Sequence, residues 1–258
     1  MKNIRTLSII VLASIFLFSC DEDKPKSSNV VGEITVDLDA NKTHVRAEES
    51  LIGNLVADAY KEYAESKGKT IDFAIINGGS IRYSESTRLD GIYPAGDFTD
   101  EMIEEIFPWT DEVHTVVTVT GSELKSIFER SVSSLPTEYK GWFLQVSKEL
   151  KIQVNLSLQP QVLNETVNPI IIDTEGERIV SIKINNIEYS PESEYTLLTS
   201  DWISLGEDGY VTFANISSTL KENLDCGGCE MNEVALIQYI EKYTPVTPVI
   251  ENRITFVQ

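Results

Sequence analysis

The chain has 258 residues and a formal net charge of −20, from 21 Lys and Arg against 41 Asp and Glu. This acidity excludes nucleic-acid polymers as partners, because a phosphate backbone is bound by clustered basic side chains that release counterions. A single nucleotide remains compatible with it, since one or two arginines in a pocket are enough to bind one phosphate.

The first twenty residues have the pattern of an export signal. Lys2 and Arg5 precede an apolar run over residues 7–18, which is shorter than the roughly 20 residues of a membrane-spanning helix. The end of this segment, Leu-Phe-Ser-Cys, resembles a bacterial lipobox, so we expect a lipid anchor on Cys20. An ordinary secretory signal is the alternative, because Phe18 is bulkier than the small residue usual at that place.

Residues 1–19 are thus expected to be a signal peptide and residues 20–32 a lipid anchor and tether. Loss of the signal would remove two basic residues and no acidic one, changing the net charge from −20 to −22. The stretch 21–29 is charged, contains proline and lacks apolar residues, as flexible tethers do. We therefore expect an exported protein, anchored by lipid in the bacterial cell envelope on its periplasmic or surface face.

Nothing after Val30 resembles a second linker, so one domain is expected over residues 33–258. The apolar spacing over residues 50–66 predicts a helix, and the apolar run 71–76 predicts a buried strand that ends in a turn. Thr99 is expected to cap a helix that ends before Pro108. Further strands are expected over residues 113–120, 142–154, 179–187, 195–200 and 254–257, with helices from residue 124 and over 236–243. This mixture predicts an α/β or α+β domain.

Besides Cys20, the only cysteines are Cys226 and Cys229, in Cys-Gly-Gly-Cys. In an oxidising compartment a local disulfide is the favoured interpretation. A redox site would need the pair at the start of a helix, and a zinc site would need two further ligands. His44 and His114 are the only histidines, so we expect no metal site in this chain.

Several segments, in this order, resemble the C-terminal domain of the 5'-nucleotidase family, which includes periplasmic UDP-sugar hydrolases. They are residues 52–59 (IGNLVADA), 75–82 (IINGGSIR), 107–109 (FPW), 119–124 (VTGSEL), 143–147 (FLQVS), 199–202 (TSDW) running into 206–210 (GEDGY), and 252–254 (NRI). Together they span about residue 33 to the end of the chain. The resemblance implies a layered fold with mixed sheets flanked by helices, made here as a stand-alone domain.

The segment 77–82 combines groups that suit a small anionic ligand. A strand end delivers the amide of Asn77, Gly79 allows close approach of the backbone, and Arg82 can bind a phosphate or carboxylate through two nitrogens. A tight turn with a surface arginine is the alternative that the residues alone would favour. The resemblance implies instead that the segment lines a nucleotide site.

Trp109 and Trp202 stand where the family places two aromatic rings that enclose the base. Stacking on such a ring contributes about 1–3 kcal/mol per base, and packing in the core is the alternative for each tryptophan. Asp208 matches the acidic residue that accepts hydrogen bonds from the ribose hydroxyls, although aspartate beside glycine is also common in turns. Arg46 lies roughly where the family has another arginine that binds phosphate, and a solvent-facing arginine is its alternative.

Two positions depart from the family pattern near the base. Asp111 stands where some relatives have a polar residue that contacts the base. Lys148 stands where relatives often have glycine, and we expect its side chain to crowd the base edge. The base preference is therefore open.

In full-length family members a preceding domain holds two catalytic metal ions with Asp-x-His, an Asn-His-Asp segment and further histidines. This sequence has neither motif, so we assign it no catalytic residue and no cofactor, and expect divalent metals only in a partner. The leading hypothesis is a nucleotide- or nucleoside-binding subunit that works in nucleotide catabolism with a separately encoded metallophosphatase. The alternatives are a solitary envelope lipoprotein that captures nucleotides or nucleosides, and a structural module with a decayed pocket.

Overall fold

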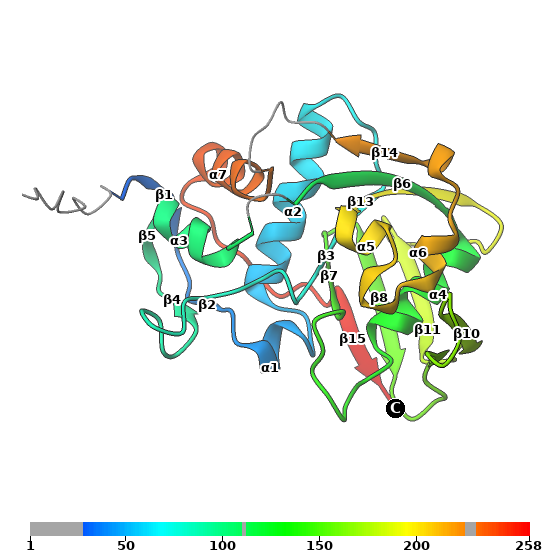
Figure 1. Cartoon of the computed structure of the whole chain (residues 1–258). Coiled ribbons are helices and arrows are strands. Elements are labelled where there is room, and N and C mark those ends of the chain that lie inside the picture. The colour runs from blue at the N-terminus through cyan, green and yellow to red at the C-terminus, as the bar shows by residue number, and fades with distance from the viewer. Residues whose placement is uncertain (1–27, 110–111, 225–230) are drawn as a thin grey trace, which may run out of the picture.

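The computed structural model describes residues 28–109, 112–224 and 231–258 (Figure 1). The expected signal peptide, the anchor Cys20, the base-contacting candidate Asp111 and the pair Cys226 and Cys229 lie outside these ranges. Within these ranges, every helix is too short or too polar to cross a membrane.

A five-stranded mixed sheet forms the centre of the molecule. In spatial order its strands are β14 (Lys221–Leu224), β6 (His114–Thr120), β13 (Glu194–Ser200), β3 (Phe73–Asn77) and β7 (Leu144–Val146). β13 and β3 run parallel, whereas the other neighbouring pairs are antiparallel. β3 is buried along its whole length, as its nearly continuous apolar sequence predicts for a strand covered on both faces.

This sheet separates two hydrophobic cores. Successive side chains of a strand point to opposite faces, and in β3 the residues Ala74 and Ile76 join one core while Phe73 and Ile75 join the other. β13 is divided in the same way, and its Leu198 belongs to the first core. Any element that reaches round the edge of the sheet therefore connects the two cores.

Helices cover the face of the sheet that carries the first core. The helix α2 (Leu51–Ser66) lies between α7 (Met231–Tyr243) and the strand β3 (Figure 1). The side chain of Ser50 caps α2 by accepting a hydrogen bond from the backbone nitrogen of Gly53, and Thr99 caps α3 (Asp100–Ile106) through Met102. The same half contains α1 (Lys42–Val45) and two small antiparallel sheets, β1 (Val30–Ile34) with β5 (Gly96–Thr99) and β2 (Leu38–Asp39) with β4 (Ile92–Tyr93).

A second sheet and a helix cover the opposite face. The four-stranded sheet has the order β12 (Ile187–Glu188), β11 (Ile179–Ile184), β8 (Leu150–Asn155) and β15 (Ile254–Val257). The helix α4 (Gly121–Ser131) begins at a capping box formed by Thr120 and Glu123. The remaining elements are β9 (Val162–Asn164), β10 (Ile171–Thr174), α5 (Asp201–Ser204), η1 (Glu207–Gly209), α6 (Val211–Asn215) and η2 (Ser218–Leu220). The predicted fold class, with mixed sheets flanked by helices, is confirmed.

Two of the expected strands are wrong in extent. The stretch 142–154 is not one strand but two, β7 in the central sheet and β8 in the second sheet. The stretch 179–187 likewise divides into β11 and β12, because Asn185 and Asn186 adopt left-handed backbone angles, with φ of 51° and 66°, and form a tight turn. The last helix begins five residues before the expected position, at Met231.

A buried ion pair joins the segments 52–59 and 252–254, which are the first and the last of those that resemble the 5'-nucleotidase family. Arg253 donates to both carboxylate oxygens of Asp58 on α2, each at 2.8 Å, and also to the carboxylate of Glu251. A further bond reaches the carbonyl oxygen of Val146 in β7, at 3.0 Å. These contacts join the C-terminal strand to α2 and to the central sheet, which gives both segments a structural explanation.

Candidate functional site

A cavity of about 450 Å³ lies where loops from both halves of the molecule converge. Its walls come from the segment before α2, the loop after β3, the loop after α3, the loop before β7, and the turns after β13. The residues that line it are Arg46, Asn77, Gly79, Ser80, Arg82, Trp109, Glu112, Gly141, Asp201, Trp202 and Asp208. One cavity therefore brings together the predicted nucleotide-binding residues Arg46, Asn77, Gly79, Arg82, Trp109, Trp202 and Asp208.

The loop after β3 fits tightly between two neighbouring segments. The backbone nitrogen of Gly79 donates to the carbonyl oxygen of Gly141 at 2.8 Å. A Cβ atom added to Gly78 would lie 2.3 Å from the carbonyl oxygen of Val45, so this approach requires glycine. Ser80 donates its hydroxyl to Oδ1 of Asn77 at 2.8 Å, which leaves the two N–H donors of that amide for the cavity.

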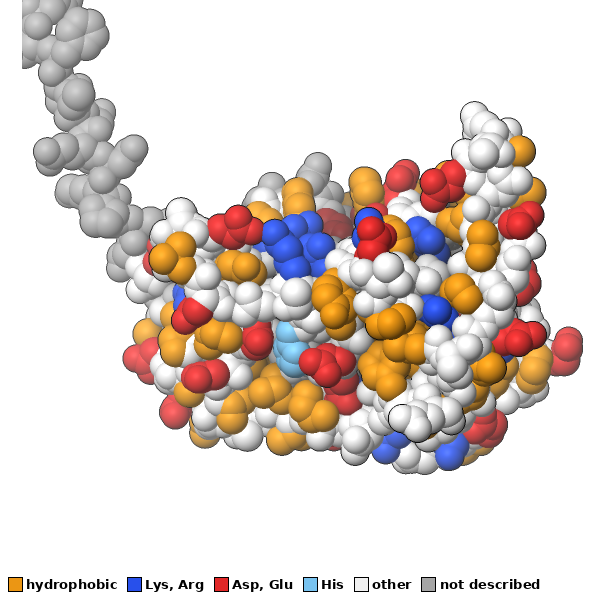
Figure 2. All heavy atoms as spheres, turned by 90° about the horizontal axis from the view of Figure 1, so that it is seen from below, with side chains coloured by type: hydrophobic (Ala, Val, Ile, Leu, Met, Phe, Trp, Pro, Cys, Tyr) orange, Lys and Arg blue, Asp and Glu red, His pale blue; other side chains and the backbone are white. Residues whose placement is uncertain are grey.

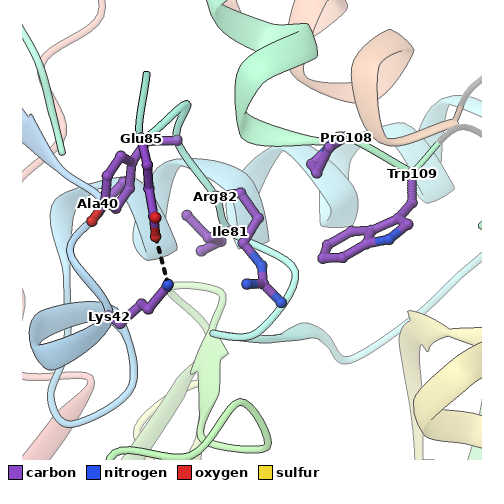
Figure 3. Close-up of a pocket in the computed structure, with 8 residues that line it drawn as sticks. Ala40, Lys42, Ile81, Arg82, Glu85, Pro108 and Trp109 are labelled. Carbon is purple, nitrogen blue, oxygen red and sulfur yellow. Dashed lines mark hydrogen bonds and ion pairs between the residues drawn. The ribbon is translucent and has the colours of Figure 1, made fainter. Parts of the chain in front are cut away.

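Two arginines bring positive charge to the cavity. The guanidinium of Arg82 donates to the carbonyl oxygen of Gly79 and lies over the Trp109 ring (Figure 3). The Nε atom of Arg46 is buried and has no hydrogen-bond partner among the described residues. Burial lowers the pKa of both arginines, the neighbouring Arg82 charge lowers that of Arg46 further, and the Asp208 carboxylate opposes the shift in both. A half-buried guanidinium whose buried Nε has no partner among these residues favours an anionic ligand.

The position of Arg46 depends on Gln145, whose role no local sequence pattern indicates. Gln145, in β7, is fully buried, and its Nε2 donates to the carbonyl oxygens of Val45 at 2.9 Å and Glu48 at 2.7 Å. Its Oε1 accepts a hydrogen bond from the backbone nitrogen of Ser50 at 3.1 Å. Gln145 thereby fixes both ends of the short segment that carries Arg46.

The two tryptophans lie at the mouth of the cavity rather than in a core. Trp109 follows α3 and is 46% exposed, while Trp202 lies in the short helix α5 after β13 and is 49% exposed. Packing in the core, the alternative for both residues, is therefore wrong. The rings are held by separate elements and remain accessible to a ligand.

Three carboxylates complete the lining. Asp208 lies in the turn after Gly206 and has a left-handed backbone, with φ of 57°. Asp201 and Glu112 were not among the predicted residues, although both adjoin predicted positions in the sequence. The Oε2 atom of Glu112 accepts a hydrogen bond from Nδ2 of Asn232 at 2.8 Å, a contact with α7 that no local pattern reveals.

The expectation for Lys148 is wrong. Because β7 runs antiparallel to β3, with Leu144 opposite Asn77 and Val146 opposite Ile75, the chain moves away from the cavity along β7. Lys148 therefore lies beyond the far end of the strand, in a small groove that also includes Asp58. Its backbone nitrogen donates to Oδ1 of Asp58 at 2.9 Å.

Neither histidine lines the cavity. His44 lies on α1 beside Glu48, with its Nδ1 atom 2.8 Å from Oε1 of the carboxylate. His114 is fully buried, and burial lowers its pKa to about 3. Across the part of the chain that the structure describes, no group of three or more His, Cys, Asp or Glu residues could hold a metal ion.

Comparison with known proteins identifies the family. The profile of the family described as 5'-nucleotidase, C-terminal domain, matches residues 30–215. Protein 5NUC of Lutzomyia longipalpis is 29% identical over 246 residues, which cover 88% of this chain and 38% of that protein. Snake venom 5'-nucleotidase of Crotalus adamanteus is 28% identical over 243 residues, which cover 89% of this chain and 37% of that protein. The chain thus spans less than two fifths of these relatives.

Solved structures agree on the fold. The 5'-nucleotidase precursor from Thermus thermophilus superimposes with a TM-score of 0.70 at 23% identity, over 89% of this chain and 39% of that one. The NAD nucleotidase of Haemophilus influenzae gives a TM-score of 0.66 at 19% identity, over 88% of this chain and 38% of that one. Since the family profile covers most of the sequence and the fold agrees, this protein belongs to the 5'-nucleotidase C-terminal domain family.

Proposed function

We propose that this protein is the nucleotide- or nucleoside-binding component of a 5'-nucleotidase system, and that it acts in nucleotide catabolism with a separately encoded metallophosphatase. The observation that carries the proposal is the presence of two half-exposed tryptophans at one cavity with two arginines and Asp208. Aromatic faces suit a base, a carboxylate suits a vicinal diol, and guanidinium groups suit a phosphate.

Each part of the ligand has a candidate partner. Trp109 and Trp202 would hold the base, with Asp111 near it, and the Asn77 amide and the Gly79 backbone would face the anionic part of the ligand. Asp208 would accept hydrogen bonds from the ribose hydroxyls. Arg46 and Arg82 would bind the phosphate, since both lie close enough to Asp208 for its charge to affect their pKa.

Hydrolysis would depend on the partner. A two-metal centre activates the attacking water and stabilises the leaving oxygen. This chain would bind the nucleoside part of the substrate. The test is AMP hydrolysis by the partner metallophosphatase, in Mn²⁺ or Zn²⁺, with and without this protein. We expect negligible turnover by this protein alone and increased turnover on mixing. Metal-dependent turnover by this protein alone would contradict the proposal.

A solitary protein that captures nucleotides or nucleosides is the second candidate, because the same cavity would serve it. Isothermal titration with AMP, adenosine and UDP-glucose separates both candidates from a structural module, for which no binding is expected. Binding without any effect on a partner's turnover would favour the capturing protein.

The expected location is part of the same proposal. The face drawn in Figure 2 carries many acidic side chains, and its basic side chains occur in small separate groups, which supports attachment by lipid rather than by charge. Replacement of Cys20 by Ser should move the protein from the membrane fraction to the soluble fraction. The proposed bond between Cys226 and Cys229 should appear as a mass increase of about 2 Da on reduction, because the reductant supplies two electrons and two protons are taken up.

A further inference from the structure

The backbone of Asp208 is hydrogen-bonded by an arginine that does not line the cavity. Arg130, in the last turn of α4, donates from Nε at 2.9 Å and from Nη2 at 2.7 Å to the backbone carbonyl oxygen of Asp208. The two donors of one planar group fix both the position and the direction of that carbonyl. The contact joins residues 78 positions apart in the sequence.

The conformation that Arg130 holds is an unusual one. Asp208 has φ of 57° and ψ of 16°, in the left-handed region that costs a non-glycine residue about 1–2 kcal/mol. Such a backbone persists only where its surroundings stabilise it. The neighbouring Gly209 leaves room for the contact, because a Cβ atom there would lie 2.7 Å from Nη2 of Arg130.

The guanidinium of Arg130 is itself held by an aromatic ring. Its Cζ atom lies 4.0 Å from the centroid of the Trp142 ring, within the range of a cation–π interaction. The hydroxyl of Tyr210 donates to the carbonyl oxygen of Trp142. Arg130 therefore joins two parts of the cavity wall, the turn that carries Asp208 and the loop that carries Gly141.

We propose that Arg130 is a positioning residue for ribose recognition: by fixing the backbone of Asp208, it directs the carboxylate toward the sugar hydroxyls. This inference rests on the proposed function, because it presupposes a nucleoside in the cavity. Arg130 itself touches no ligand. Its effect should therefore appear in the discrimination between sugars and not in the affinity for a free base.

The test is the ratio of the Kd for 2'-deoxyadenosine to the Kd for adenosine, measured by isothermal titration. We expect a wild-type ratio of at least about five, because the missing hydroxyl removes a hydrogen bond to a charged group. Asp208→Ala should bring the ratio to about one. Arg130→Lys keeps the charge but loses the two-nitrogen geometry, and should lower the ratio at least about threefold while the Kd for adenine stays unchanged.

Lys140→Ala is the matched control. The Lys140 ammonium also lies over the Trp142 ring, at 5.8 Å, but within the described ranges it forms an ion pair with Glu138 and none with Asp208. This variant should keep the wild-type ratio. If Arg130→Lys fails to fold, Trp142→Phe offers a second test. This variant keeps the Arg130 guanidinium and makes the aromatic ring beneath it smaller. We expect it to lower the ratio less than Arg130→Lys would.

The outcomes separate this inference from the proposed function. No binding of adenosine to the wild type would overturn the proposed function itself. Binding of adenosine with a wild-type ratio near one would overturn the ribose contact of Asp208 and, with it, the role of Arg130. A ratio unchanged in Arg130→Lys would overturn only the role of Arg130. Equal weakening of adenine, adenosine and 2'-deoxyadenosine in Arg130→Lys would also overturn it, because that result indicates a general structural role.

Discussion

The guanidinium of Arg82 lies over the ring of Trp109, with its Cζ atom 4.8 Å from the ring centroid (Figure 3). One face of this tryptophan therefore has a cationic partner before any ligand arrives. A base can use the other face, or the same face after Arg82 has moved. A phosphate that attracts Arg82 would thus influence the stacking of the base, which couples the two ends of the ligand.

Arg82→Ala should distinguish nucleotides from nucleosides. A hydrogen bond to a charged group contributes about 1.5–3 kcal/mol, so we expect AMP to bind about 10- to 100-fold more weakly and adenosine to bind as before or more tightly. Isothermal titration with both ligands measures the difference. Lys42→Ala is the control, because Lys42 lies in the adjoining pocket and pairs with Glu85 at 2.8 Å. Equal affinity of Arg82→Ala and the wild type for AMP would exclude a phosphate at Arg82.

Trp202→Ala should weaken binding of both AMP and adenosine, because each loses one stacking surface worth about 1–3 kcal/mol. Trp202→Phe should restore most of the affinity, since a phenyl ring still covers the base. Quenching of tryptophan fluorescence and titration calorimetry both report the change. Tyr139→Ala removes a similarly exposed aromatic ring outside the cavity and should have no effect. If it weakens binding as much as Trp202→Ala does, the ligand lies elsewhere.

Asp58→Ala should destabilise the fold strongly. It removes the carboxylate that accepts two hydrogen bonds from the buried Arg253 and leaves Glu251 to pair with that guanidinium. Because one partner of a buried ion pair is lost while a second remains, we expect a cost of about 3 kcal/mol. Urea denaturation monitored by circular dichroism measures the loss in the free energy of unfolding. The control is Glu65→Ala, which removes a more exposed partner of Lys61 and should cost less than about 1 kcal/mol. A similar loss in both variants would refute the structural role of the Arg253 pair.

His114→Phe should change how the free energy of unfolding depends on pH. Burial lowers the pKa of His114 to about 3, below its ordinary value of about 6.5, so the unfolded chain binds this proton first. In the wild type, His114 therefore lowers the stability by about 1.4 kcal/mol per pH unit as the pH falls from about 6.5 towards 3. Neither ring nitrogen has a hydrogen-bond partner within the described ranges, so phenylalanine loses no contact of that kind.

Urea denaturation of both proteins between pH 8 and pH 4.5 checks this prediction. The difference at pH 8 reports packing alone, because the histidine is then neutral in both states. We expect the advantage of the variant to grow by about 2–3 kcal/mol on acidification to pH 4.5. A constant difference across this range would show that His114 binds its proton as readily in the folded protein as in the unfolded chain.

Sequence patterns predicted those parts of the molecule whose causes are local. Thr99 caps the helix that follows it, as predicted from its side-chain chemistry, and the helix predicted over residues 50–66 is present as α2. The residues gathered at the cavity were recognisable because the segments that carry them resemble those of the 5'-nucleotidase C-terminal domain family. Their composition alone favoured a tight turn for residues 77–82. The break between β7 and β8 was missed, because no glycine or proline separates them and their partners are strands far away in the sequence.

Long-range contacts explain the other differences. The role of Gln145 follows from carbonyl oxygens 97 and 100 positions away, and the contact of Glu112 with Asn232 spans 120 positions. Lys148 was misplaced because its distance from the cavity depends on strand direction, which side-chain composition does not encode. In each case the sequence indicated the chemistry of the side chain, but it did not indicate which distant residue the side chain contacts.

The central sheet divides the interior into two cores, yet the cavity draws on both. Arg46 and Trp109 adjoin elements of the first core, while Trp202 and Asp208 adjoin elements of the second. A nucleoside bound there would fasten the two halves together, and neither could open without releasing it. At a ligand concentration of 100 times Kd the bound state gains about 2.7 kcal/mol. Amide protons on both sides of the sheet that exchange only through opening of the cavity would then exchange about 100-fold more slowly.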